Sequence, residues 1–242
     1  MDWQSEGYIL SVRSHGETSA IVKAFTKEHG VHAGLVRGGR SRRMRPVLQA
    51  GNKVSLEWHA RLSEHLGIFS IEAINLQAAL IMEDRLALAA INAVSAVTIE
   101  ALPEREAHAN LFTAFEILLE HLNDINIWPA LYVRYEIALL QALGYGLDLK
   151  TCAATGGNEY LTHVSPRSGR AVCASSAEPY LDKLLALPGF LRGENTVAPD
   201  DIAKGLKLSG YFLTSRIFYT FNKDIPQARY RLLETLKNAD II

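Results

Sequence analysis

The sequence predicts an α+β protein, with a small five-stranded β-barrel in residues 1–76 and an α-helical domain in residues 77–242. The first 75 residues contain five short runs rich in Tyr, Ile, Leu and Val, separated by turns that contain glycine. From residue 77 the apolar period changes from two residues to about 3.6. With 48% hydrophobic and 21% charged residues, the 242-residue chain can bury a substantial core.

The first two predicted strands are expected to pair as a hairpin around the tight turn His15-Gly16-Glu17. The expected strands are Gly7–Arg13, Thr18–Thr26, Val31–Val36, Val54–Trp58 and Leu66–Ile74. Five short strands favour a closed barrel, for which an OB-fold and an SH3-like barrel are both compatible with the pattern.

The helical domain is predicted from apolar stripes bounded by proline and glycine. Its expected helices are Gln77–Leu102, Ala107–Leu122, Pro129–Leu143, Pro179–Leu187, Pro199–Asn222 and Pro226–Leu236, and residues 146–175 resemble a loop. The first helix is apolar almost all round and is expected to be central. Its apolar part is too short and too polar for a membrane span, and the N-terminus lacks the apolar segment of a signal peptide.

Charge is distributed unevenly although the net charge of the chain is −1. Residues 1–75 carry +3, residues 76–150 carry −6 and residues 151–242 carry +2. A basic N-terminal region attracts anionic partners through its local potential, whatever the net charge of the chain.

The most basic segment lies after the third predicted strand, where five arginines fall within nine residues: Arg37, Arg40, Arg42, Arg43 and Arg45. The planar fork of arginine suits phosphate oxygens, and neighbouring glycines let a ligand approach the backbone. The segment contains no aromatic residue, which favours contact with a nucleic-acid backbone over base recognition. A solvated loop without a ligand is the alternative.

Further candidate DNA-binding residues lie on or near the predicted barrel: Arg13, Lys23, Trp58 and Arg61. Tyr8, Phe25, Trp58 and Phe69 lie on predicted strands, where they either stack on bases or fill the core. Trp58 is the best candidate for stacking, because its neighbours suggest an exposed barrel edge. A second DNA or partner patch is possible at Lys204, Lys207 and Arg216, with an ordinary exposed helix face as the alternative.

Chemistry beyond binding has little support in the sequence. The chain contains no phosphate-binding loop, zinc-protease motif or nucleophile elbow, so we expect no enzyme. Its two cysteines, Cys152 and Cys173, form no disulfide framework, and a cytoplasmic location is expected. With His163 they make a poor zinc set, because Thr155 and Ser176 occupy the positions that C-x-x-C pairs would require. No metal and no cofactor are therefore predicted.

Four segments, in order along the chain, resemble the RecO family of bacterial recombination mediators. They are Glu6-Gly-Tyr-Ile-Leu with His15-Gly-Glu17, then Val36-Arg-Gly-Gly-Arg-Ser41, then Tyr135–Cys152 with its Leu143-Gly-Tyr145, and finally Gly210-Tyr-Phe-Leu-Thr-Ser-Arg216. No segment is specific alone, and the resemblance depends on their order over nearly the whole chain.

The resemblance implies an N-terminal OB-fold, a helical domain, and a zinc ribbon or its degenerate remnant at about residues 147–176. It also implies binding of single- and double-stranded DNA, strand annealing, and help in loading RecA onto strands coated by single-strand-binding protein. The implied partners are RecR and the C-terminal tail of that binding protein, in the bacterial cytoplasm near the nucleoid. The chain departs from the family in keeping one cysteine of each C-x-x-C pair.

Two other functions are compatible with the sequence. One is a protein-binding adaptor whose barrel docks a partner in place of DNA. The other is a nucleic-acid enzyme whose active site has no recognisable motif.

Overall fold

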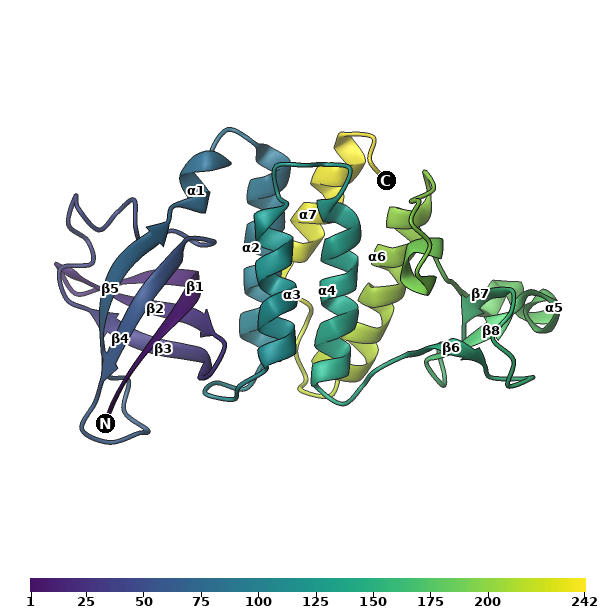
Figure 1. Cartoon of the computed structure of the whole chain (residues 1–242), viewed down its shortest axis with the longest axis horizontal. Coiled ribbons are helices and arrows are strands. Elements are labelled where there is room, and N and C mark those ends of the chain that lie inside the picture. Colours follow the sequence, from purple (N-terminus) through teal and green to yellow (C-terminus); the bar gives the residue numbers. More distant parts are fainter. The chain divides into compact units, whose positions relative to one another are not determined.

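A computed structural model describes residues 1–242, which fold into two compact units (Figure 1). The first unit contains Met1–Asn123 and Pro226–Thr235, and the second contains Asp124–Ile225 and Leu236–Ile242. The predicted change from strands to helices occurs at residue 76, within the first unit, which therefore contains a barrel and helices.

Five strands form a closed barrel in the order β1-β2-β3-β5-β4. They are β1 (Asp2–His15), β2 (Ser19–Thr26), β3 (Gly30–Val36), β4 (Lys53–His59) and β5 (Ile68–Asn75), which confirms all five predicted strands and the first hairpin. The long β1 pairs with β4 through its first half and with β2 through its second. A parallel pairing of Leu35 with Ile68 closes the barrel, which is the OB-fold arrangement.

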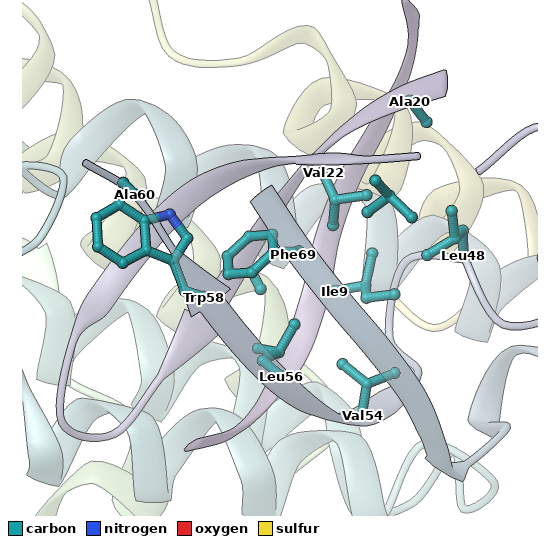
Figure 2. Packing of buried hydrophobic residues seen from close by; sticks show 11 residues of the cluster. Ile9, Ala20, Val22, Leu48, Val54, Leu56, Trp58, Ala60 and Phe69 are labelled. Atoms are coloured by element: carbon teal, nitrogen blue, oxygen red, sulfur yellow. The ribbon is translucent and has the colours of Figure 1, made fainter. Parts of the chain in front are cut away.

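Alternation along the strands fills the barrel interior (Figure 2). On β4, Val54, Leu56 and Trp58 are buried, whereas Glu57 and His59 between and after them are exposed. Ile9, Val22 and Phe69 complete the same cluster from the neighbouring strands. A period of two residues places every second side chain inside, which is why the sequence pattern located these strands well.

The helices of the first unit begin with α1 (Gln77–Leu80), α2 (Arg85–Ala101) and α3 (Ala109–Glu120). The prediction of one continuous helix over Gln77–Leu102 is wrong. Asp84 has extended backbone angles and its carboxylate accepts hydrogen bonds from Leu86 and Ala87, so it caps a new helix. The α2 helix is buried on most sides, as predicted. None of the helices combines the length and the apolar character that a membrane span requires.

Helix α3 is fixed to the barrel by apolar and charged contacts. Phe112 and Phe115 pack against the rings of Tyr8 and Phe25. Glu116 accepts hydrogen bonds from Tyr8 and from the Lys53 ammonium group. These contacts make the barrel and α3 parts of one packed unit.

In the second unit, α4 (Trp128–Ala142) packs against α6 (Asp201–Phe212), which continues as the π-helical segment η3 (Leu213–Phe218). The close approach occurs at Gly205, where an added Cβ atom would lie 3.0 Å from Val133. The buried Ser209 hydroxyl donates to the Glu136 carboxylate at 2.5 Å. The helix predicted over Pro199–Asn222 is confirmed over Asp201–Phe218, although its last part, η3, has π-helical hydrogen bonds. Helix α7 (Gln227–Asn238) follows Pro226, as predicted.

Residues 146–186, expected to contain a loop and a short helix, form a small sheet that we call the ribbon sheet. Its order is β6 (Asp148–Cys152), β8 (Arg170–Cys173), β7 (Leu161–Val164) and β9 (Leu185–Ala186). The short helix predicted over Pro179–Leu187 is confirmed in its first part only, as the 3₁₀ segment η1 (Glu178–Lys183), which follows α5 (Ala174–Ala177). Its last part is instead strand β9, which pairs with β7. A second 3₁₀ segment, η2, spans Gly189–Arg192.

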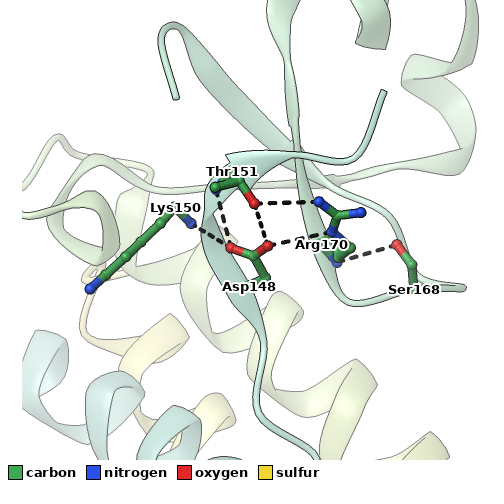
Figure 3. A network of polar contacts seen from close by, with 5 residues as sticks. All are labelled: Asp148, Lys150, Thr151, Ser168 and Arg170. Atoms are coloured by element: carbon green, nitrogen blue, oxygen red, sulfur yellow. Dashed lines mark hydrogen bonds and ion pairs between the residues drawn. The ribbon is translucent and has the colours of Figure 1, made fainter. Parts of the chain in front are cut away.

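A polar network joins the start of β6 to β8 in the ribbon sheet (Figure 3). The Asp148 carboxylate accepts hydrogen bonds from the backbone N–H groups of Lys150 and Thr151 and from the Thr151 hydroxyl. Arg170 on β8 donates to Asp148 at 3.4 Å. These hydrogen bonds lower the pKa of Asp148, and the contact with the Thr151 hydroxyl has the largest effect. The network fixes the parallel pair of strands through side-chain and backbone hydrogen bonds.

Candidate nucleic-acid interface

The arginine segment between β3 and β4 is anchored to the barrel through its apolar side. Ser41 accepts hydrogen bonds from the N–H groups of Met44 and Arg45, and Met44 accepts one from Leu48, so residues 41–48 make a short helical turn. Met44, Val47 and Leu48 pack on the barrel core. The arginines Arg37, Arg40, Arg42, Arg43 and Arg45 are all exposed. We call these five residues the arginine surface.

Two further contacts hold the ends of this segment. The Arg40 guanidinium donates to the Gly16 carbonyl at 2.8 Å, and its backbone N–H donates to Thr18 at 3.0 Å, which ties the segment to the β1–β2 turn. At the other end, the side-chain N–H groups of the fully buried Asn52 donate to the carbonyls of Pro46 and Val47. The arginine surface is therefore fixed at both ends.

A polar hollow of about 390 Å³ lies beside the arginine surface. Arg40 and Arg45 line it together with Ser14 and Gln49, and no acidic residue lines it. None of the five arginines takes part in an ion pair. Such a hollow can accept an oxyanion such as a phosphate group, because its walls offer guanidinium, hydroxyl and amide donors.

The structure separates the three basic residues that were expected to extend the surface. Arg13 is exposed on the second half of β1, in the hairpin whose turn Arg40 contacts. Arg61 is exposed in the β4–β5 loop. Lys23 forms an ion pair with Glu104 at 2.8 Å, so its charge is largely matched and it adds little positive potential.

The expectation that Trp58 lies at an exposed barrel edge is wrong, since the side chain is only 3% exposed. The β4–β5 loop covers it, and its indole N–H donates to the Leu66 carbonyl at 3.0 Å. Gly67 has a positive φ of 67°, and any Cβ atom there would collide with the indole ring. Arg105 lies over the ring and donates to the carbonyls of Ser63 and His65 in the same loop.

The other strand aromatics are also buried. Tyr8, Phe25 and Phe69 are at most 4% exposed and pack inside the first unit. Of the two alternatives for these residues, filling the core is the correct one, and none of them forms a stacking platform. None of the candidate stacking residues is therefore exposed beside the arginine surface.

The patch expected from Lys204, Lys207 and Arg216 is not a uniform basic surface. Lys204 pairs with Asp200 at 3.7 Å, one turn earlier in the helix, and Lys207 is exposed. Arg216 instead turns towards the ribbon sheet. Its guanidinium lies 4.9 Å from the ring centre of Phe212 and donates to the Arg167 carbonyl.

A second hollow, of about 540 Å³, lies between the ribbon sheet and η1, close to Tyr211 of α6. Val172, Leu184 and the rings of Tyr180 and Tyr211 provide an apolar lining, and Arg167 and Lys183 provide its charges. We call this the ribbon hollow. An apolar cavity flanked by cations suits an apolar side chain that neighbours carboxylates.

The two cysteines come together in the ribbon sheet without a set of zinc ligands. The backbone N–H of Cys173 donates to the Cys152 sulfur at 3.2 Å, and the Cys173 sulfur lies 3.3 Å from the Ser176 hydroxyl. No group of three or more His, Cys, Asp or Glu side chains is placed to hold a metal ion. Two thiols and two hydroxyls do not make a tetrahedral zinc site.

Hydrogen bonds to sulfur control the ionisation of both thiols. Burial raises the pKa of the Cys152 thiol, but hydrogen bonds from the Thr155 hydroxyl and from the backbone of Cys173 outweigh it and lower the pKa to about 6. Contact with the Ser176 hydroxyl is the main cause that lowers the pKa of Cys173. Thr155 and Ser176 thus act on the sulfur atoms, at the positions where a zinc ribbon would have its other two cysteines.

The residues that hold the arginine surface in place were not among those predicted from the sequence. The spacing of Met44, Val47 and Leu48 is that of one helical face and offered a signal for an anchored turn. Asn52 offered none, because it resembled an ordinary turn residue beside Gly51. Its role depends on burial and on partners that only the fold brings close.

Comparison with known proteins agrees with this architecture. The family model described as Recombination protein O N terminal matches residues 1–76, and the model described as Recombination protein O C terminal matches residues 82–223. A DNA repair protein RecO of Methylobacterium nodulans is 48% identical over 246 residues, covering 99% of both chains. RecO proteins of Ruegeria and Caulobacter vibrioides are 46% and 47% identical, covering 98% and 99% of this chain and the same shares of their own. The chain therefore belongs to the RecO family of DNA repair and recombination proteins.

Proposed function

We propose that this protein binds single- and double-stranded DNA through the arginine surface and does so without catalysing a reaction. The observation that carries the proposal is the set of five exposed arginines, none of them in an ion pair, on an anchored turn beside a polar hollow without acidic lining residues. Neutralising phosphates releases condensed counterions, which makes binding favourable and dependent on salt. Because no aromatic side chain accompanies the arginines, base edges stay free for pairing.

We further propose that the protein anneals complementary strands, because the base edges of the bound DNA remain free. Two strands repel each other through their phosphates, and a surface that neutralises one backbone lowers that repulsion without blocking base pairing. The same DNA binding would allow the protein to assist RecA loading on strands coated by single-strand-binding protein, as the family relationship suggests.

Replacing all five arginines of the arginine surface with alanine tests the DNA-binding proposal. We expect affinity for an oligonucleotide at low salt to fall by roughly two orders of magnitude, and the salt slope to decrease by about 0.9 for each phosphate that is no longer neutralised. A matched control removes the same charge from exposed positions elsewhere: Lys27, Arg85, Lys150, Arg231 and Lys237. If both variants bind with the same reduced affinity, or both bind as tightly as the wild type, the arginine surface is not the DNA-binding site.

The same variant separates the proposal from its alternatives. An adaptor whose barrel docks a protein would keep its DNA affinity, if it has any, when the five arginines are removed. An enzyme would turn over labelled DNA, whereas we expect annealing without ATP, without added metal and without any covalent change to the strands. A chelator that abolishes annealing, or cleaved product, would contradict the non-enzymatic proposal.

We also propose RecR and the C-terminal tail of single-strand-binding protein as partners, with the tail seated in the ribbon hollow. A tail that is acidic and ends in an aromatic residue matches apolar walls flanked by Arg167 and Lys183. No surface of the chain is singled out for RecR.

A labelled tail peptide tests this seat, with a scrambled peptide of the same composition as its control. The double substitution Arg167→Glu and Lys183→Glu should weaken peptide binding by about tenfold or more, because it replaces attraction with repulsion. The matched variant Lys204→Glu and Lys207→Glu reverses two charges on α6 and should bind normally. The opposite result would place the tail on the α6 face.

A further inference from the structure

The two cysteines of the ribbon sheet form a pair that the DNA-binding proposal does not use. Cys152 ends β6 and Cys173 ends β8, and these strands are neighbours in the sheet. The backbone N–H of Cys173 lies 3.2 Å from the Cys152 sulfur, and both side chains are buried and free of any disulfide. The chain has only two cysteines, so each thiol has a single partner within the molecule.

We propose that Cys152 and Cys173 are a peroxide-responsive modification site, at which a hydroperoxide converts the two thiols into a reversible disulfide bond across β6 and β8. The inference is independent of the proposed DNA binding, which concerns the arginine surface of the barrel. It predicts a chemical state of the ribbon sheet that changes with the oxidant concentration.

The exposures of the two sulfur atoms assign their roles. Cys173 is 8% exposed and Cys152 is 0% exposed, so an oxidant from solvent meets Cys173 first. The Cys173 thiolate attacks the peroxide, the O–O bond breaks, one oxygen remains on sulfur as a sulfenic acid and the other leaves as water or an alcohol. Cys152 then attacks this sulfur as a thiolate, the S–O bond breaks, and a water molecule leaves. Two thiols lose two electrons, which the peroxide accepts.

Neighbouring groups support both steps. The hydroxyls of Ser175 and Ser176 lie 3.6 Å and 3.3 Å from the Cys173 sulfur and can stabilise its thiolate by hydrogen bonding. The lowered pKa of Cys152 is consistent with attack as a thiolate at neutral pH. Since no metal-ligand set surrounds the sulfur atoms, they are available for reaction with each other.

Peptide mapping of the full-length protein tests the proposal directly. Trypsin cleaves after Lys150, Arg167, Arg170 and Lys183, which places the cysteines in separate peptides, Thr151–Arg167 and Ala171–Lys183. After brief treatment with hydrogen peroxide and alkylation of the remaining thiols in denaturant, we expect the two peptides to be found joined. We expect the link to disappear after treatment with a thiol reductant, and the untreated protein to show both peptides alkylated.

Three results would overturn the proposal. Both cysteines could remain alkylatable after peroxide treatment, Cys173 could pass to a sulfinic acid without a link, or the link could occur only in covalent dimers on a non-reducing gel. All three outcomes can be measured on the wild-type protein, so the test does not depend on a variant that folds. As a matched control, Cys152→Ser removes the resolving thiol, and peroxide should then leave Cys173 as a sulfenic or sulfinic acid with no link within the chain.

Discussion

The side-chain amide of Asn52 donates a hydrogen bond to the carbonyl of Pro46 at 2.8 Å, at the point where the arginine segment returns to the barrel. The same nitrogen donates to Val47 at 2.9 Å, and the amide oxygen accepts a hydrogen bond from the N–H of Ala78 at 3.0 Å. One buried side chain therefore connects the end of the arginine segment, the start of β4 and the start of α1.

Replacing Asn52 with alanine should weaken DNA binding while leaving every arginine in place. The change leaves the Pro46 and Val47 carbonyls without this donor and the Ala78 N–H without its acceptor, so we expect the free energy of unfolding to fall by about 2–3 kcal/mol. Affinity should fall by about three- to tenfold, because the arginines lose their fixed positions. Urea unfolding and oligonucleotide titration measure both effects.

The control for Asn52 is Gln4→Ala, which removes an exposed side chain that donates to the Glu57 carboxylate at 3.4 Å, away from the arginine surface. We expect little change in stability there, since solvent can replace that donor. An Asn52→Ala variant that is destabilised but binds DNA as tightly as the wild type would contradict a positioning role for Asn52.

Substitution of Trp58 should affect stability and leave DNA affinity unchanged. The indole is buried and bonded to Leu66, so Trp58→Ala should cost about 3–5 kcal/mol of the free energy of unfolding. Trp58→Phe keeps most of the packing and gives a folded protein for the binding assay, in which we expect unchanged affinity. A loss of affinity in this folded variant would restore the base-stacking role.

The strands were predictable because the side chains of a half-buried β-strand alternate between the core and the solvent. Val54, Leu56 and Trp58 alternate with polar residues, and this pattern depends only on which side of the strand faces the barrel core. The break before α2 was harder to predict. The segment around Asp84 continues a helical apolar pattern, and only the hydrogen bonds of its side chain reveal a cap.

The residue types of the candidate site were predictable from the sequence, but the tertiary contacts around them were not. Five arginines near two glycines are visible in the sequence alone, whereas the pairing of Lys23 with Glu104 joins residues far apart in the chain. The burial of Trp58 likewise depends on a loop that folds back over its ring. Contacts of this kind are properties of the tertiary fold, and no local pattern encodes them.

His32 should make the protein sensitive to mild acid. Its ring is 4% exposed, packs against Trp3 and Trp58, and has no hydrogen-bond partner at either nitrogen. Burial, helped by the charge of Arg105, lowers the pKa of His32 from 6.5 to about 4. The unfolded chain therefore binds a proton that the folded chain does not between these two values.

Because the unfolded chain binds more protons over this range, the free energy of unfolding falls as the pH decreases from about 6.5 towards 4. The total decrease is roughly 3 kcal/mol. The contribution is fully present above pH 6.5. Urea unfolding at several pH values measures it, and His32→Phe should remove most of the slope over this range. An unchanged slope in that variant would mean that another group is responsible.

Glu116 should be important for the attachment of α3 to the barrel. It accepts hydrogen bonds from Lys53 at 3.0 Å and Tyr8 at 3.1 Å, and the contact with Glu116 is the main cause that raises the pKa of Lys53. Glu116→Gln removes the charge at constant shape, and we expect a loss of about 1–2 kcal/mol in the free energy of unfolding. Glu120→Gln, exposed one turn later, is the control and should change little.

The pH dependence of this contact has the opposite sign to that of His32. A raised pKa for Lys53 means that the folded chain keeps a proton that the unfolded chain loses, so the stabilisation is present below pH 10.5 and lost as the pH rises further. The alkaline loss of stability should be smaller in Glu116→Gln than in the wild type. Equal losses would show that Lys53 does not depend on Glu116.

A zinc site should appear when the two missing cysteines are restored. The Ser176 oxygen lies 3.3 Å from the Cys173 sulfur, and two sulfurs on one tetrahedral zinc are separated by about 3.8 Å, given Zn–S bonds of about 2.3 Å. Since the Thr155 hydroxyl also contacts the Cys152 sulfur, the double substitution Thr155→Cys and Ser176→Cys places a new thiol beside each native one. We expect elemental analysis to find about one zinc per chain in this variant and none in the wild type.

Each single substitution gives three thiols and should bind zinc more weakly, and His163→Ala in the double variant should leave the zinc content unchanged. A wild-type protein purified with one zinc per chain would contradict the metal-free ribbon and, with it, the availability of Cys152 and Cys173 for a disulfide.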